Sequence, residues 1–206
     1  MTDDFALLDE PRRPWLDPER LKSKFLQFSA ATHPDHFHNA GEDEKRAINQ
    51  RVADLNAAYN HLREPRERLR CLLELELGAQ PKDVQRIPPG TMELFAEVGQ
   101  LCRDVDTFVA RKAQVTSPLL KARRFEQGLE WMDKLITLQN KILAKKQDLD
   151  VELKSLNAAW ETAPTVGTEA RLPGLPLARL EQIYRIFSYI ARWTEQIQER
   201  TVQLAS

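Results

Sequence analysis

The sequence has little cysteine and little glycine for its length. Of its 206 residues, 2 are cysteines and 7 are glycines. Cys71 and Cys102 stand far apart and neither belongs to a C-x-x-C pair, so zinc ribbons and redox motifs have no support. Each cysteine lies within an apolar helical pattern, and we therefore expect two buried, reduced thiols. The scarcity of glycine is typical of a helical protein.

The sequence also lacks an excess of either charge and any long apolar run. Lysine and arginine number 30 against 31 aspartates and glutamates, for a formal net charge of −1. Nucleic-acid binding needs a concentrated positive excess, so we expect no nucleic-acid ligand. No apolar run approaches the roughly 18 residues of a membrane span. The acidic start, MTDDFALLDE, lacks the basic residues of a secretory or mitochondrial signal. We expect a cytoplasmic protein that makes no membrane contact.

Two amphipathic helices are predicted in the first third of the chain. The first begins with Asp17 as N-cap and Pro18 at the first helical position, and Pro34 ends it. The second follows Gly41, starts with acidic residues and runs to about Leu62. Their apolar stripes can pack the two helices as an antiparallel hairpin, with the loop between them at its exposed tip.

The remaining chain is predicted to be helical too, which makes the fold class all-α. A further helix runs from Pro65 to Gly78, and the proline-rich segment AQPKDVQRIPPG follows it. Longer apolar repeats then predict helices over about 92–112, 118–160 and 177–204. We therefore expect an N-terminal domain over 1–78, a linker over 79–90 and a C-terminal three-helix bundle over 91–206.

The segment ATHPDHFHNAG, residues 31–41, holds three of the four histidines of the chain. His33, His36 and His38 with Asp35 could be metal ligands, but the segment has no closed ligand geometry and no fourth ligand nearby. A catalytic His–Asp pair would need a nucleophile or a pocket beside it, and the segment offers neither. A docking surface for another protein is the interpretation that remains, with His36 and His38 as polar surface residues.

The arrangement of this segment resembles a J domain. The tripeptide His33-Pro34-Asp35 stands at the tip of a predicted antiparallel hairpin whose first helix carries Arg20, Lys22 and Lys24. Over about residues 5–77, the stretches FALLDEPRRPWLDPERLKSKFLQF, HPD-x-F and LNAAYNHLREPRERLRCLLEL are similar to the HscB type of J-domain co-chaperone, which serves iron–sulfur cluster assembly. Beyond them, helix order and a proline-bearing linker agree with that family.

The resemblance implies a protein that joins two partners. The J domain would dock on a chaperone ATPase of the DnaK/HscA class through His33, Pro34 and Asp35, aided by the basic residues, and stimulate ATP hydrolysis by that partner. The protein itself would be no enzyme and would hold no cofactor or metal. Two features depart from the family pattern: His36 stands where lysine is common, and the last helical turn before the tripeptide is SAAT rather than basic.

The C-terminal bundle would hold the client, an IscU-type iron–sulfur scaffold protein. The stretch MELFAEVGQLCRDVD offers an apolar patch and neighbouring carboxylates, and Tyr189 of the last helix could join them. The predicted client-binding residues are Leu94, Phe95, Val98, Glu93, Glu97, Asp104 and Tyr189. The apolar members could instead be bundle core. Two other functions stay open: a J-domain protein with a different client, and a degenerate J-like helical scaffold that stimulates no chaperone.

Overall fold

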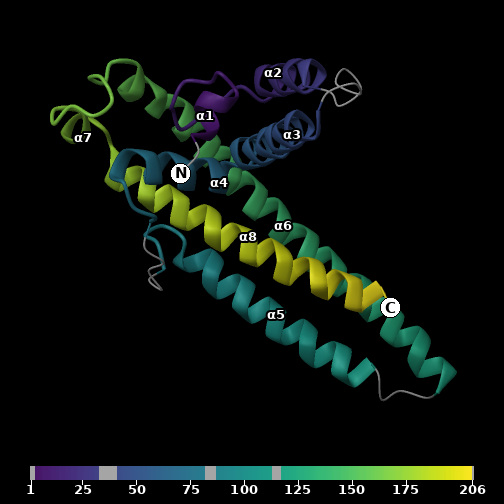
Figure 1. The fold of residues 1–206 in the computed structure, drawn as a ribbon. Coiled ribbons are helices and arrows are strands. Elements are labelled where there is room, and N and C mark those ends of the chain that lie inside the picture. Colours follow the sequence, from purple (N-terminus) through teal and green to yellow (C-terminus); the bar gives the residue numbers. More distant parts are fainter. Residues whose placement is uncertain (1–2, 33–40, 82–86, 113–116, 206) are drawn as a thin grey trace. The chain divides into compact units, whose positions relative to one another are not determined.

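The computed structural model describes residues 3–32, 41–81, 87–112 and 117–205, and within these ranges it contains helices and no strand. Figure 1 labels the helices in chain order. Their bounds are α1 Asp4–Leu7, α2 Pro18–Ala31, α3 Glu42–Arg63, α4 Pro65–Leu77, α5 Met92–Lys112, α6 Pro118–Glu161, α7 Arg171–Gly174 and α8 Leu177–Ala205. The predicted all-α class is confirmed, and the short helix α7 is not among the helices predicted above.

The chain divides into two compact units. Unit 1 consists of Met1–Asp83 and Asp150–Tyr184, and unit 2 consists of Val84–Leu149 and Arg185–Ser206. This division differs from the one drawn from sequence, because residues 150–184 group with the N-terminal segment and not with the rest of the predicted bundle. The sequence-based domains 1–78 and 91–206 remain a prediction about which fragments fold independently.

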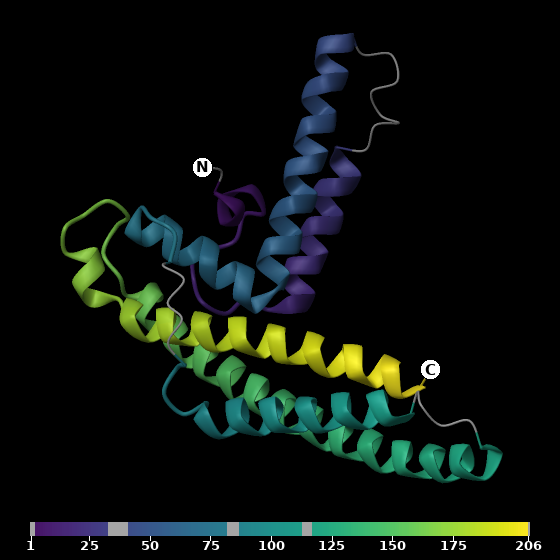
Figure 2. The same ribbon diagram turned by 90° about the horizontal axis from the view of Figure 1, so that it is seen from below.

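In unit 1, α2 and α3 form a helical hairpin. The side chain of Asp17 accepts a hydrogen bond from the backbone N–H of Arg20 at 2.9 Å, and Pro18 takes the first helical position, so the predicted start of α2 is confirmed. Phe25 and Tyr59 stack between the two helices with ring centroids 4.2 Å apart and an interplanar angle of 11°. Figures 1 and 2 both show the helices side by side.

Buried polar side chains connect the distant segments of unit 1. Arg68 donates to the backbone carbonyls of Pro14 at 2.8 Å and Leu62 at 2.7 Å, and its burial lowers its pKa to about 10. Asn157 donates to the backbone carbonyl of Trp15 at 2.9 Å and accepts from its N–H at 3.0 Å. The bonds to Pro14 and Trp15 satisfy backbone groups that the N-terminal segment, which is mostly irregular, would otherwise leave without partners.

Glu76 of α4 anchors a second buried network in unit 1. Arg171 donates to both carboxylate oxygens of Glu76, with Nε to Oε2 at 2.7 Å and Nη2 to Oε1 at 2.6 Å. Trp160 Nε1 donates to Oε1 of the same carboxylate at 3.2 Å, and Arg171 also donates to the carbonyl of Pro164. A bidentate arginine with a further donor is the arrangement that makes a buried carboxylate tolerable, and it ties α7 and the end of α6 to α4.

Unit 2 is built from α5 and from the parts of α6 and α8 that belong to it. Its core is apolar and comes from all three helices: Val98, Cys102, Val105, Phe108, Leu135, Leu138, Ile142, Leu149, Ile186, Phe187, Ile190, Trp193 and Ile197. Ion pairs at the edge join α5 to its neighbours, from Lys141 to Glu97 at 2.6 Å and from Arg200 to Asp106 at 2.8 Å.

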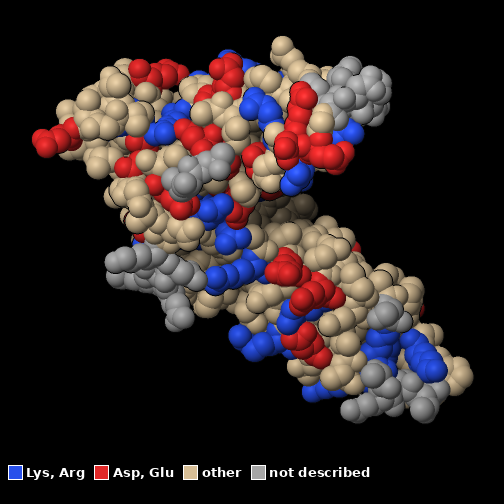
Figure 3. All heavy atoms as spheres, in the orientation of Figure 1, with Lys and Arg blue, Asp and Glu red and all other residues tan. Residues whose placement is uncertain are grey.

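Several features of the surface and core agree with the composition. Both cysteines are free and buried, which confirms the expectation for the thiols. On the face drawn in Figure 3, basic and acidic side chains are interspersed over both units. No helix in the described part of the chain has a stretch both long and apolar enough to cross a membrane.

Candidate functional site

The first candidate surface is at the end of the α2–α3 hairpin where the chain passes from α2 to α3. His33, Pro34 and Asp35, together with His36 and His38, fall outside the described residues. The chain on either side is described: α2 ends at Ala31 and α3 begins at Glu42, after Gly41 in an extended conformation. The tripeptide therefore stands in the connection between the two helices of the hairpin.

The three basic residues predicted on α2 differ in what they contact. Lys24 Nζ donates to the backbone carbonyl and the carboxylate of Asp9 and lies 3.2 Å from Oε1 of Glu10. Arg20 Nε lies 3.3 Å from the same Glu10 oxygen. The Glu10 side chain is 2% exposed and that of Lys24 is 18% exposed, so these two cations compensate a buried carboxylate of their own unit.

Lys22 and Arg20 are both exposed on this helix, but Arg20 is paired with Glu10. A charge that is already paired inside the molecule contributes less to steering a partner than one surrounded by solvent. The available positive charge of α2 is thus smaller than a count of its basic residues indicates, and Lys22 supplies the largest share of it.

The second candidate surface is on unit 2, where Phe95 of α5 meets Tyr189 of α8. Phe95 is 41% exposed, and the two rings are in edge contact with centroids 6.4 Å apart. Tyr189 also contacts Trp193 at 5.7 Å, and Arg192 lies over its ring at 5.8 Å. The structure brings Phe95 and Tyr189 together, as the sequence analysis expected.

Val98 does not share that surface. It is 1% exposed and belongs to the core of unit 2, so its prediction as part of an exposed apolar patch is corrected. Its position is three residues beyond Phe95, and at about 3.6 residues per turn that step turns the side chain toward the helices packed on α5. Leu94 is half-buried. Met92 is 60% exposed one turn before Phe95, and the sequence analysis did not select it.

The predicted carboxylates occupy the other flank of α5. Glu97 Oε1 accepts from Lys141 of α6 at 2.6 Å, whereas Phe95 faces α8. Asp104, seven residues and about two turns further on, accepts from Gln100 at 2.9 Å, and Glu93 precedes Glu97 by one turn. Glu97 and Asp104 line a groove of about 520 Å³ together with Trp131 and Lys134 of α6. The expected single patch is therefore two surfaces, one apolar and one acidic.

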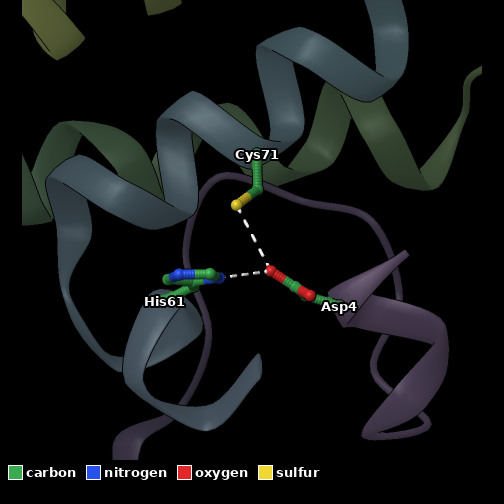
Figure 4. A group of neighbouring side chains, drawn as sticks. All are labelled: Asp4, His61 and Cys71. Atoms are coloured by element: carbon green, nitrogen blue, oxygen red, sulfur yellow. Dashed lines mark hydrogen bonds and ion pairs between the residues drawn. The ribbon is translucent and has the colours of Figure 1, made fainter. Parts of the chain in front are cut away.

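The structure also assembles a group of side chains that the sequence analysis missed. Asp4, His61 and Cys71 come from α1, α3 and α4 and point toward one another (Figure 4). His61 Nδ1 lies 2.8 Å and Cys71 Sγ 3.4 Å from the same oxygen of Asp4. No sequence signal could have found them, because no two of these residues share a recognisable metal or catalytic spacing.

Comparison with known proteins bears on these surfaces. No family model matches the sequence. A co-chaperone protein HscB homolog from Bordetella pertussis is 39% identical over 127 residues, which are 59% of this chain and 75% of the relative. The HscB homolog of Haemophilus ducreyi is 27% identical over 154 residues, which are 74% of this chain and 87% of the relative. For the homolog from Mannheimia succiniciproducens, 38% identical over 80 residues, the match spans 39% of this chain and 46% of the relative.

Solved structures agree in fold. The chaperone HscB from Vibrio cholerae superposes with a TM-score of 0.65 at 20% identity, over 98% of this chain and 99% of that one. Human co-chaperone protein HscB gives a TM-score of 0.61 at 18% identity, over 98% of this chain and 83% of that one. The helical hairpin with its helical C-terminal part is the all-helical fold of these structures. The chain belongs to the HscB co-chaperone family.

Proposed function

We propose that this protein docks on a chaperone ATPase of the DnaK/HscA class, stimulates ATP hydrolysis by that chaperone and delivers to it an IscU-type iron–sulfur scaffold protein. His33, Pro34 and Asp35 are the contact that triggers hydrolysis. The surface around Phe95 and Tyr189 holds the client. The protein acts by bringing two partners together and carries out no chemical step itself.

The observation that carries the proposal is the His-Pro-Asp sequence between the two helices of the hairpin in a chain of the HscB co-chaperone family. Pro34 fixes its own backbone φ angle and so limits the conformations available to the segment. Asp35 can accept charge-assisted hydrogen bonds from an arginine of the partner. Lys22, exposed on α2, attracts an acidic surface of the chaperone.

The test of docking is the ATPase rate of a DnaK-class chaperone with the full-length protein. We expect Asp35→Asn and His33→Gln to abolish stimulation and to leave the helical circular dichroism spectrum unchanged. The matched control is Asp43→Asn, which removes an exposed carboxylate of the first turn of α3 that pairs with Arg46 at 2.8 Å. Stimulation that survives Asp35→Asn, or that Asp43→Asn abolishes equally, contradicts the assignment of the trigger.

The client surface is supported by the exposure of aromatic and apolar side chains at one place on unit 2. Aromatic residues surrounded by less important contacts are the usual anchors of protein interfaces. Phe95, Tyr189 and Met92 offer such a group. Glu97 and Asp104 lie on the other flank of α5 and act mainly on the association rate and its salt dependence.

Phe95 and Val98 form a matched pair for testing this surface. Phe95→Ala should weaken binding to an IscU-type scaffold by roughly tenfold to a hundredfold, as loss of an interface anchor does, and should change the free energy of unfolding little. Val98→Ala should lower the free energy of unfolding by about 2 kcal/mol through a core cavity and leave the affinity of the folded protein unchanged. An unchanged affinity for Phe95→Ala would move the client site elsewhere.

The pairing of Arg20 and Lys24 with Glu10 favours a second candidate, a J-like helical scaffold that binds a client without stimulating a chaperone. The two candidates differ in one measurement. A protein that binds the scaffold protein and never raises the ATPase rate, at any concentration of DnaK-class partner, fits the second candidate only.

A further inference from the structure

Asp4, His61 and Cys71 form a cluster of three different ligand types in unit 1 (Figure 4). Their donor atoms lie within 4.8 Å of one another. The imidazole Nδ1 and the thiol Sγ both approach Oδ2 of Asp4, at 2.8 Å and 3.4 Å. Because a carboxylate oxygen only accepts, Nδ1 and Sγ must each carry a hydrogen in this arrangement. Two protons therefore converge on one oxygen, at the place where a cation could replace them.

The cluster is not an activated cysteine nucleophile. In such a site the thiol gives its proton to a neighbouring base and its pKa is lowered. Here the thiol donates to Asp4, and burial, followed by the charge of that carboxylate, raises the pKa of Cys71 to about 12. The thiol is protonated at neutral pH, so the three residues have no use as a catalytic triad.

We propose that Asp4, His61 and Cys71 bind a divalent transition-metal ion of the zinc type. Zinc takes carboxylate oxygen, imidazole nitrogen and thiolate sulfur in tetrahedral sites. Bond lengths of that kind place an oxygen and a nitrogen ligand about 3.4 Å apart, and an oxygen and a sulfur ligand about 3.6 Å apart. The present separations of 2.8 Å and 3.4 Å are shorter, so the ion would enter by spreading the oxygen and nitrogen by about 0.6 Å and the oxygen and sulfur by about 0.2 Å.

The surroundings favour a cation and leave room for a further ligand. The cluster opens on a pocket of about 250 Å³ whose charged lining also includes Asp54, Glu74 and Arg70. Arg70 is neutralised within its own helix, since it donates to Glu67 at 2.8 Å and to Glu74 at 3.3 Å. His61 is partly exposed, which gives the ion a path from solvent. A water molecule in the pocket would complete the coordination of three protein ligands.

Binding has a defined proton balance. The metal takes the place of the thiol proton, which leaves to solvent, and an imidazole with one ring hydrogen moves it from Nδ1 to Nε2. One proton is therefore released for each ion bound. The bound ion links α1 to α3 and α4 and so raises the melting temperature of the protein.

The test uses the full-length protein, stripped of metal by a chelator, and titration with Co²⁺ and with Zn²⁺ alone. We expect one ion per chain, a thiolate-to-cobalt charge-transfer band, release of one proton per ion and a higher melting temperature with Zn²⁺. Cys71→Ser should lose the band and the thermal shift. Cys102→Ser, which removes the other buried thiol, should keep both.

A second variant tests the proposal if Cys71→Ser does not fold. His61→Ala removes a partly exposed ligand and should weaken Co²⁺ binding at least tenfold with the fold intact. Cobalt binding without a thiolate band would place the ion at other residues, for example the histidines of 33–38, and would overturn the proposal. The absence of cobalt binding would overturn it too. None of these measurements involves the chaperone, so the outcome is independent of the function proposed above.

Discussion

The buried pair of Glu76 and Arg171 leads to a quantitative prediction about unit 1. Arg171→Met removes the guanidinium and leaves the carboxylate of Glu76 in place. The two side chains are 2% and 8% exposed, so solvent cannot replace the lost partner. Breaking a buried ion pair by removing one member costs about 3–5 kcal/mol, and we expect a loss of that size in the free energy of unfolding. Hydrogen bonding to Glu76 raises the pKa of Arg171, so the guanidinium carries its charge in the folded protein.

A double variant separates the buried charge from the loss of packing. Glu76→Met combined with Arg171→Met removes both charges. The remaining penalty is the loss of partners for Trp160 Nε1–H and for the carbonyl of Pro164, about 1 kcal/mol each. The double variant should thus be more stable than Arg171→Met alone. Arg179 gives a matched surface control, because it pairs with Glu152 in the same bidentate way, at 2.6 and 2.8 Å. Those side chains are 43% and 32% exposed, and Arg179→Met should cost less than about 1 kcal/mol.

The assay is urea unfolding followed by far-ultraviolet circular dichroism, with the dependence of the free energy on urea compared among variants. A loss below about 1 kcal/mol for Arg171→Met, or equal losses for Arg171→Met and Arg179→Met, would refute the reasoning, since burial is the difference between the two pairs.

Three further predictions concern stability and can be read from the same unfolding curves. Asn157→Ala leaves the N–H and carbonyl of Trp15 without partners and should cost about 2–3 kcal/mol; an effect near zero would mean that water replaces both bonds. Gly78→Ala places a side chain at φ +69 with open space around it and should cost about 1–2 kcal/mol by backbone strain, whereas Gly99→Ala within α5 should stabilise by up to about 1 kcal/mol. Phe5→Ala leaves a cavity at a fully buried position and should lower the free energy of unfolding by about 3–5 kcal/mol. A small loss would mean that α1 is not packed on the core.

Helix boundaries could be predicted from the sequence because their causes are local. Asp17 with Pro18 starts α2, and Gly78, in a left-handed conformation, ends α4. Each signal concerns a few neighbouring residues and the backbone groups that a helix end leaves open. The long apolar repeats likewise fixed α5, α6 and α8 to within a residue or two.

Contacts between distant segments could not be predicted in this way. Glu76 and Arg171 are 95 residues apart, and nothing near either residue specifies the other. The grouping of 150–184 with the N-terminal segment depends on such pairs. On α5, the sequence placed Phe95 and Val98 within one turn of each other, but the positions of α6 and α8 decide which of the two is buried.

The two buried cysteines have a practical consequence for experiments on this protein. Both thiols are largely buried, and burial raises the pKa of each, so neither presents a reactive thiolate to an alkylating reagent at neutral pH. A cysteine introduced at an exposed position that has no proposed binding role, such as Ser23→Cys on α2, would then be the fast-reacting thiol of the chain. A fluorophore could be attached beside the proposed chaperone contact without replacing either native cysteine, and the encounter with the chaperone could be followed in real time.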